Sequence, residues 1–158
     1  MTNEIRPIFA SPVDMTITLA SIAAGNGRIS AQVDNTTTRF NLITVYARIE
    51  SGGTGPADEE VYEFYLIKFD ADTPEYVSDG FSDADAAVTV KPPNANFIGA
   101  IAVTNDADTQ FFGDFVVRDP GPEFSIVFWN DTGQTISTTE ADSFIHFIGQ
   151  NDRVEDSP

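Results

Sequence analysis

The chain has 158 residues, of which 25 are Asp or Glu and 8 are Lys or Arg, so its formal net charge at pH 7 is −17. Such an acidic chain is repelled by the phosphate backbone, because affinity for nucleic acids depends largely on cationic side chains. The same sign of charge disfavours anionic membranes, and no apolar run approaches the ~20 residues that span a bilayer. We therefore expect one domain with neither nucleic-acid nor membrane partners.

Residues 16–22 and 28–33 are the first strand candidates. Apolar and polar residues alternate in both segments, and Asn26-Gly27 lies between them. Because Asn-Gly readily adopts the positive φ angles of a tight reversal, the pattern predicts a β-hairpin.

Residues 40–50 and 60–70 are the longest strand candidates, and a polar, Gly-rich loop joins them. Both carry apolar residues on both faces. In the second, Tyr62 and Phe64 alternate with Tyr65 and Ile67. A monomeric sandwich keeps one face of each sheet polar, so this pattern predicts an oligomer, with Tyr62 and Phe64 as candidate contacts with another subunit or another protein.

Five further strand candidates follow at residues 87–91, 97–103, 111–118, 123–130 and 143–149, separated by Pro, Gly, Asn and Asp. No segment has a sustained helical stripe, and short helical turns are expected only near residues 83–87 or 138–142. We therefore predict an all-β protein, a jelly-roll-like antiparallel β-sandwich of about eight to ten strands; a barrel is the second alternative.

The two ends of the chain are predicted to be arms. Residues 1–13 contain Ile5, Ile8, Phe9 and Val13 but also two prolines, which exclude an uninterrupted ladder in a central strand. We therefore divide the chain into an N-terminal arm (1–13), a sandwich domain (14–149) and a C-terminal tail (150–158). The four apolar residues of the arm are further candidate contacts with another subunit or another protein.

Residues suited to chemistry are scarce. The acidic segment 70–85 offers Asp70, Asp72 and Asp79 as calcium candidates, but Glu75 occupies the position where an EF-hand requires Gly. A solvated acidic loop is the other reading of this segment and the one we adopt, so we expect neither a metal nor a cofactor.

The chain has no Cys and one His, His146. Without a second His or any Cys, His146 is expected to be a structural residue or a subunit contact. Ser143 lies three residues before it, so the two side chains of a strand point to opposite faces and form no local dyad. We expect no enzyme, although two carboxylates that meet in space would leave glycoside hydrolysis open.

Four segments, residues 30–40, 62–67, 97–103 and 124–133, resemble small virion structural proteins of tailed bacteriophages. The shared features are a Val33-Asp34-Asn35-Thr36 turn that leads into a long strand, and an Asn130-Asp131-Thr132-Gly133 turn that follows a late apolar strand.

This resemblance implies a capsid decoration, or cement, protein with no catalytic residues. Such a protein is made in the host cytoplasm, binds the major capsid protein on the outside of the virion, and forms a homotrimer that bridges capsid subunits. The alternative is a receptor-binding or carbohydrate-binding module of a phage tail fibre, in which exposed aromatic rings would bind sugars.

Overall fold

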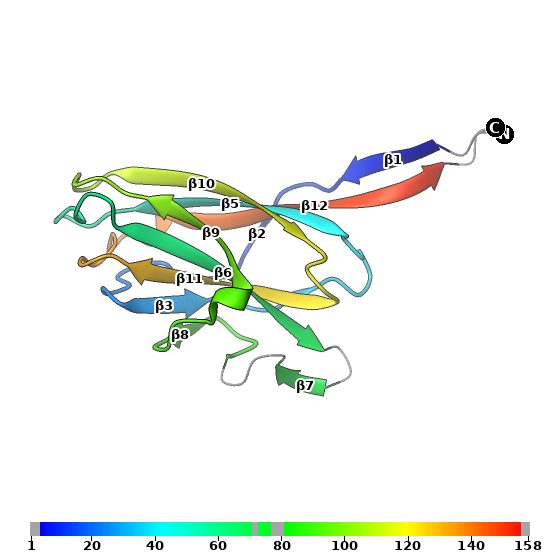
Figure 1. Ribbon diagram of the computed structural model, residues 1–158, viewed down its shortest axis with the longest axis horizontal. Helices are drawn as coiled ribbons and strands as arrows, with labels where there is room; N and C mark the ends of the chain where they lie inside the picture. Colours follow the sequence, from blue (N-terminus) through cyan, green and yellow to red (C-terminus); the bar gives the residue numbers. More distant parts are fainter. Residues whose placement is uncertain (1–3, 71–72, 77–80, 156–158) are drawn as a thin grey trace.

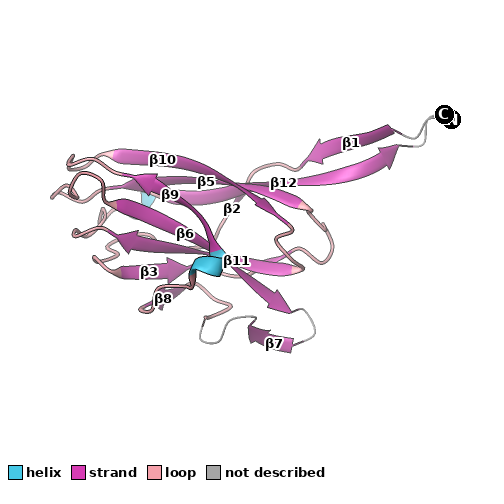
Figure 2. Cartoon of the chain, in the orientation of Figure 1, coloured by secondary structure: helices cyan, strands magenta, loops and turns pink. Residues whose placement is uncertain are grey.

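The computed structural model describes residues 4–70, 73–76 and 81–155, and within these ranges it contains twelve β-strands and two short 3-10 helices. The strands form two antiparallel sheets that pack face to face (Figure 1). The helices, η1 (Asn94–Asn96) and η2 (Glu140–Asp142), are one turn each (Figure 2). The predicted all-β sandwich is therefore confirmed.

The first sheet, sheet A, has the strand order β1-β12-β5-β10, with β2 beside β1 on the same edge of β12. Its strands are β1 (Glu4–Phe9), β2 (Val13–Asp14), β5 (Leu42–Glu50), β10 (Gln110–Arg118) and β12 (Phe144–Glu155).

The second sheet, sheet B, has the order β7-β6-β11-β3-β8; β9 also pairs with β6, and β4 with β11. Its strands are β3 (Asn26–Ile29), β4 (Val33–Asp34), β6 (Val61–Asp70), β7 (Thr73–Tyr76), β8 (Ala86–Val88), β9 (Phe97–Ala102) and β11 (Glu123–Asp131).

This strand order is that of a jelly roll. When β1 with β2, and β3 with β4, are each counted as one broken strand, sheet A contains the first, eighth, third and sixth strands in that spatial order. The second, seventh, fourth and fifth lie in sheet B, with β7 and β8 as additions. Two Greek keys wound across two sheets produce this arrangement.

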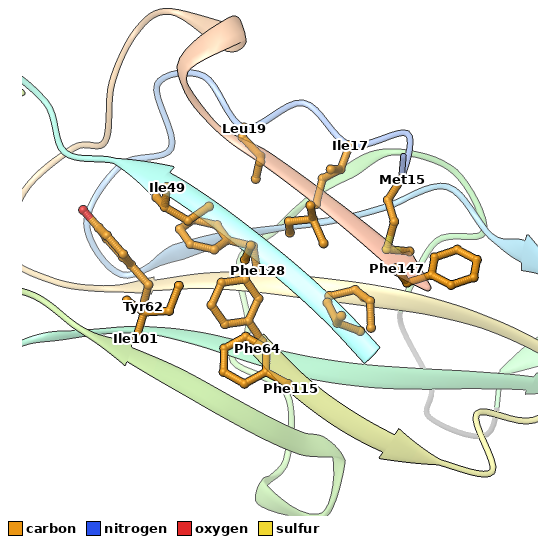
Figure 3. Close-up of a cluster of buried hydrophobic side chains, with 14 of the residues drawn as sticks. Met15, Ile17, Leu19, Ile49, Tyr62, Phe64, Ile101, Phe115, Phe128 and Phe147 are labelled. Atoms are coloured by element: carbon orange, nitrogen blue, oxygen red, sulfur yellow. The ribbon is translucent and has the colours of Figure 1, made fainter. Parts of the chain in front are cut away.

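The main core lies between the sheets, as Figure 3 shows. Residues of β5 alternate between buried and half-buried positions, so Ile43, Val45 and Ile49 point inward. The rings of Phe64 and Phe115 meet them from β6 and β10 with centroids 4.8 Å apart. Burial of these side chains contributes ~1.5–3 kcal/mol each, enough to hold a core without disulfides or metals.

A second core lies on the outer face of sheet B. It contains Ile29, Tyr65, Ile67, Phe69, Val88, Val127 and Trp129, with Phe81 and Ala86 packed against them. The segment around β8 provides the cover on this face. The two apolar faces of β6 are therefore both buried within one chain, and they do not by themselves indicate an oligomer.

Two ionic clusters fasten this cover to sheet B. Asp85 accepts hydrogen bonds from Arg28 Nε and Thr18 Oγ1, each 2.5 Å long. Burial pushes the pKa of Asp85 upward, but these bonds outweigh it and hold the pKa below its ordinary value. Farther along the chain, Lys91 Nζ lies 2.6 Å from Glu63 and 3.1 Å from Asp131.

The predicted hairpin at Asn26-Gly27 is wrong. The reversal lies earlier, where Gly25 has a φ of 67° and Asn26 N–H donates to Ala23 O. Gly27 is a β3 residue, and a Cβ there would lie 2.5 Å from Phe128 O, so close packing against β11 explains the glycine. Residues 15–22 form no ladder. They contain a turn at residues 20–21, and their apolar side chains enter the main core.

Within the described part of the chain, no helix is long and apolar enough to cross a membrane.

Candidate interaction surface

The single histidine lies on the outer face of sheet A, in β12. His146 is half-buried, whereas Ser143 is buried and its Oγ accepts a hydrogen bond from Glu50 N at 3.0 Å. Ser143 therefore precedes the strand as a buried hydrogen-bond acceptor and does not act on His146. In the described part of the chain, no hydrogen bond joins His146 to a serine or threonine hydroxyl.

His146 belongs to an aromatic stack. Its ring lies 5.1 Å from Phe144 at an interplanar angle of 13°, and 5.1 Å from Tyr46 at 30°. The guanidinium of Arg48 lies 4.6 Å from the centre of the Phe144 ring, a cation–π distance. Arg48 also donates to Asp142 O and Ala141 O, so the guanidinium is fixed from two sides.

Register explains why these groups meet. His146 lies directly opposite Tyr46 in the β12–β5 ladder, and Phe144 lies opposite Arg48. Directly opposed residues of an antiparallel pair share one face of the sheet. Because positions along a strand alternate between faces, the buried neighbours Ile145 and Ala47 point to the core while the stack points outward.

We call the outer face of sheet A the open face. It consists of Asp14 from β2, Leu42, Thr44, Tyr46, Arg48 and Glu50 from β5, Gln110, Phe112, Asp114, Val116 and Arg118 from β10, and Phe144, His146, Ile148 and Gln150 from β12. Phe112 and Val116 are 67% and 60% exposed, unusually high for large apolar side chains within a sheet. No described segment covers this face as β8 covers sheet B.

An arm continues from sheet A. Beyond Gln150, β12 leaves β5 and pairs only with β1, from Phe9 opposite Gln150 to Glu4 opposite Glu155. Figure 1 shows this two-stranded ribbon running out beyond the sandwich. Ile8 and Phe9 are exposed, Phe9 by 66%, and Ile8 lines a depression of about 490 Å³ with Phe40 at the base of the arm.

The predicted contact residues have three different outcomes. Ile8, Phe9 and Val13 are exposed and available to a partner, and Ile5 lies in β1, although its side chain is outside the described residues. The prediction for Tyr62 and Phe64 is wrong: both are buried in the main core, at 1% and 0% exposure. Burial raises the pKa of Tyr62 to about 12, with a smaller contribution from Glu60.

The calcium candidates fall at or beyond the edge of the described structure. Asp72 and Asp79 lie outside the described residues, as does the side chain of Asp70. Among the residues that are described, no group of three or more His, Cys, Asp or Glu is arranged to hold a metal ion.

Sequence reasoning missed the open face. Its signal was present in residues 110–118, where Phe112 and Val116 occupy the face opposite to Phe115 and Val117. The two-faced pattern of residues 40–50 and 60–70 predicts an oligomer, but the uncovered apolar face lies on β10.

No protein-family model matches the chain, and no curated protein matches its sequence significantly.

Proposed function

We propose that this protein is a non-enzymatic structural protein that binds the outer surface of a viral capsid as a decoration protein, as a homotrimer that bridges major capsid subunits. The observation that carries the proposal is the arm. A two-stranded ribbon is at best marginally stable alone in water. This one also exposes Ile8 and Phe9, so packing against another protein would stabilise it.

The rest of the molecule supports a structural role. The jelly roll occurs in capsid and lectin domains, an analogy of fold that does not by itself decide function. A charge of −17 keeps copies soluble and discourages contacts except through selected surfaces. The polar side chains that are buried mostly stabilise loops: Asn35, for example, donates to Phe40 O and Gly121 O and accepts from Phe40 N.

The sugar-binding alternative receives less support. A sugar platform needs aromatic ring faces turned to solvent. In the stack, Phe144 and Tyr46 each pack against His146, and Trp129 is buried in the second core. The exposed aromatic residues that this alternative could use are Phe9, Phe97 and Phe112.

Virions purified from a culture that expresses the protein provide the test. Mass spectrometry should detect the protein in proportion to the major capsid protein, in particles that retain heads but have lost their tails. Its absence from particles would overturn the proposal. Its restriction to tails would favour the receptor-binding alternative, which a glycan array then tests directly.

The arm is tested on particles stripped of the protein. Deletion of residues 1–10 should leave the sandwich folded, because β1 pairs only with the end of β12, yet should reduce rebinding at least about tenfold. A Val90→Ser variant is the matched control, since Val90 is equally exposed but lies on the side of sheet B. Equal rebinding by the truncated chain and the control would contradict a role for the arm.

A further inference from the structure

The outer faces of the two sheets differ, because the chain covers one of them and leaves the other uncovered. The outer face of sheet B is aliphatic and aromatic at its centre, and the chain covers it with its own segment around β8. The open face of sheet A carries Phe112, Val116, Tyr46, Phe144 and Ile148 without any cover from the described chain. Phe112 and Val116 are exposed and the other three are half-buried, and apolar side chains gathered on an uncovered sheet face indicate a surface that meets a partner.

The composition of the open face indicates that this partner is a protein. Aromatic residues and Arg are enriched in protein–protein interfaces, and Lys is depleted. The open face has three aromatic residues and two arginines, Arg48 and Arg118, while both lysines of the chain, Lys68 and Lys91, lie outside it.

The charged residues of the open face indicate that the partner is a second copy of this chain. The open face carries Arg48 and Arg118 against Asp14, Asp114 and Glu50, so it is nearly balanced in a chain with a net charge of −17. A strongly basic or acidic partner has little net charge to attract it here. A second copy, by contrast, repels this chain everywhere except at such a balanced face, and brings acids for the arginines and arginines for the acids.

The size of the open face determines how much surface a trimer can bury. Three strand spacings of ~4.8 Å plus the width of the outer side chains give ~20 Å across, and nine residues at ~3.3 Å give ~30 Å along. Each copy therefore contributes roughly 600 Å², so a trimer buries about 1,800 Å² in total, or about 600 Å² at each of its three contacts.

We propose that the open face is the surface through which copies of this chain associate, so that in the trimer the open faces of three copies turn toward a shared axis. The aromatic stack and the exposed row on β10 form its centre. This inference rests on the homotrimer of the proposed function but not on the virion, and it assigns capsid attachment and self-association to different surfaces: the arm and the open face.

The experiment measures the association of the purified full-length chain. Sedimentation equilibrium over a range of concentrations should give a trimer for the unaltered protein. The double variant Phe112→Thr/Val116→Thr keeps residues that favour strands but removes the apolar row, and should weaken association at least about tenfold. Val90→Thr, on the side of sheet B, is the control and should associate as the unaltered chain does.

Circular dichroism and the fluorescence of Trp129, the only tryptophan, report whether each variant is folded. A monomeric unaltered chain, or an oligomer that the folded double variant retains, would overturn the inference. The two proposals fail separately: a chain that associates through the open face but is absent from virions defeats only the capsid role, whereas a virion protein with an insensitive oligomer defeats only the open-face interface.

Discussion

The cover on sheet B allows us to predict how much stability the protein loses when Val127 is shortened. This residue lies in the middle of β11, opposite Tyr65 on one side and Ile29 on the other, and it is 0% exposed within the second core. Val127→Ala removes two methyl groups without adding a polar atom. Because the buried side chain belongs to the outer face of the sheet, its loss measures how well the segment around β8 excludes water.

The expected loss of stability is the sum of the transfer free energy of the two methyl groups and the cost of the cavity that they leave. Two methyl groups at ~0.8 kcal/mol each give about 1.6 kcal/mol. A residual cavity of about 50 Å³ at ~24 cal/mol per Å³ adds about 1.2 kcal/mol. The free energy of unfolding should therefore fall by about 3 kcal/mol, and Tm by roughly 6–12 °C for a chain of this size. Val90→Ala, the same change at a 73% exposed site, should cost less than about 0.5 kcal/mol.

Urea unfolding of both variants tests this difference. Trp129 belongs to the second core, so its fluorescence reports the cover, while far-ultraviolet circular dichroism reports the whole sandwich. The two transitions should coincide if the cover unfolds together with the sheets. Equal stability of Val127→Ala and Val90→Ala would refute the reasoning, because it would mean that the outer face of sheet B is not sealed by the chain.

Two further predictions concern polar side chains that are held by hydrogen bonds. The depressed pKa of Asp85 means that the unfolded chain takes up this proton at a higher pH than the folded chain does, so the stability it contributes is present above about pH 4 and is lost as pH falls through the folded pKa. Asp85→Asn should therefore lower stability at pH 7 and flatten the loss of stability in acid; an unchanged acid profile in thermal melts would contradict this. Asn130→Ala should cost about 2–4 kcal/mol, because the Asn130 amide donates to Ile22 O and Gln134 O and both carbonyls would lose a partner. Asn26→Ala, which removes one exposed hydrogen bond, is the control and should cost under about 0.5 kcal/mol in the same urea titrations.

The strands that the sequence predicts well are those with a strong local pattern and clear boundaries. β5, β6, β9, β10 and β11 lie within one or two residues of the predicted ranges, because apolar runs there end at loops rich in Gly, Pro, Asn and Asp. The 3-10 helix η2 falls within the predicted turn at residues 138–142. Both motifs that carry the phage resemblance contain a buried asparagine that organises a loop, so they have a structural explanation whatever the function is.

The misassigned features depend on contacts distant in sequence. The sequence of a strand does not determine what its second face contacts, which can be the same chain, another copy or water. β6 buries that face under a segment with few apolar residues, whose Val88 and Phe81 give little periodic signal. The Asn26-Gly27 pair suggested a turn, but the packing of β3 against β11 requires a residue without Cβ at Gly27. Tertiary contacts outweigh local turn preference at that position.

The balanced charge of the open face also predicts how association responds to salt. Nearly all of the negative charge lies outside this face, so copies that meet through it are opposed mainly by long-range repulsion between the remaining surfaces. Raising the ionic strength from about 0.01 M to about 0.1 M shortens the Debye length from ~30 Å to ~10 Å and screens that repulsion. Apolar contacts of Phe112 and Val116 would not be weakened by this change, so association through the open face should strengthen with salt when measured by sedimentation equilibrium. If association weakens instead, ion pairs of Arg48 and Arg118 across the interface outweigh the repulsion, and the apolar row is not its main source of affinity.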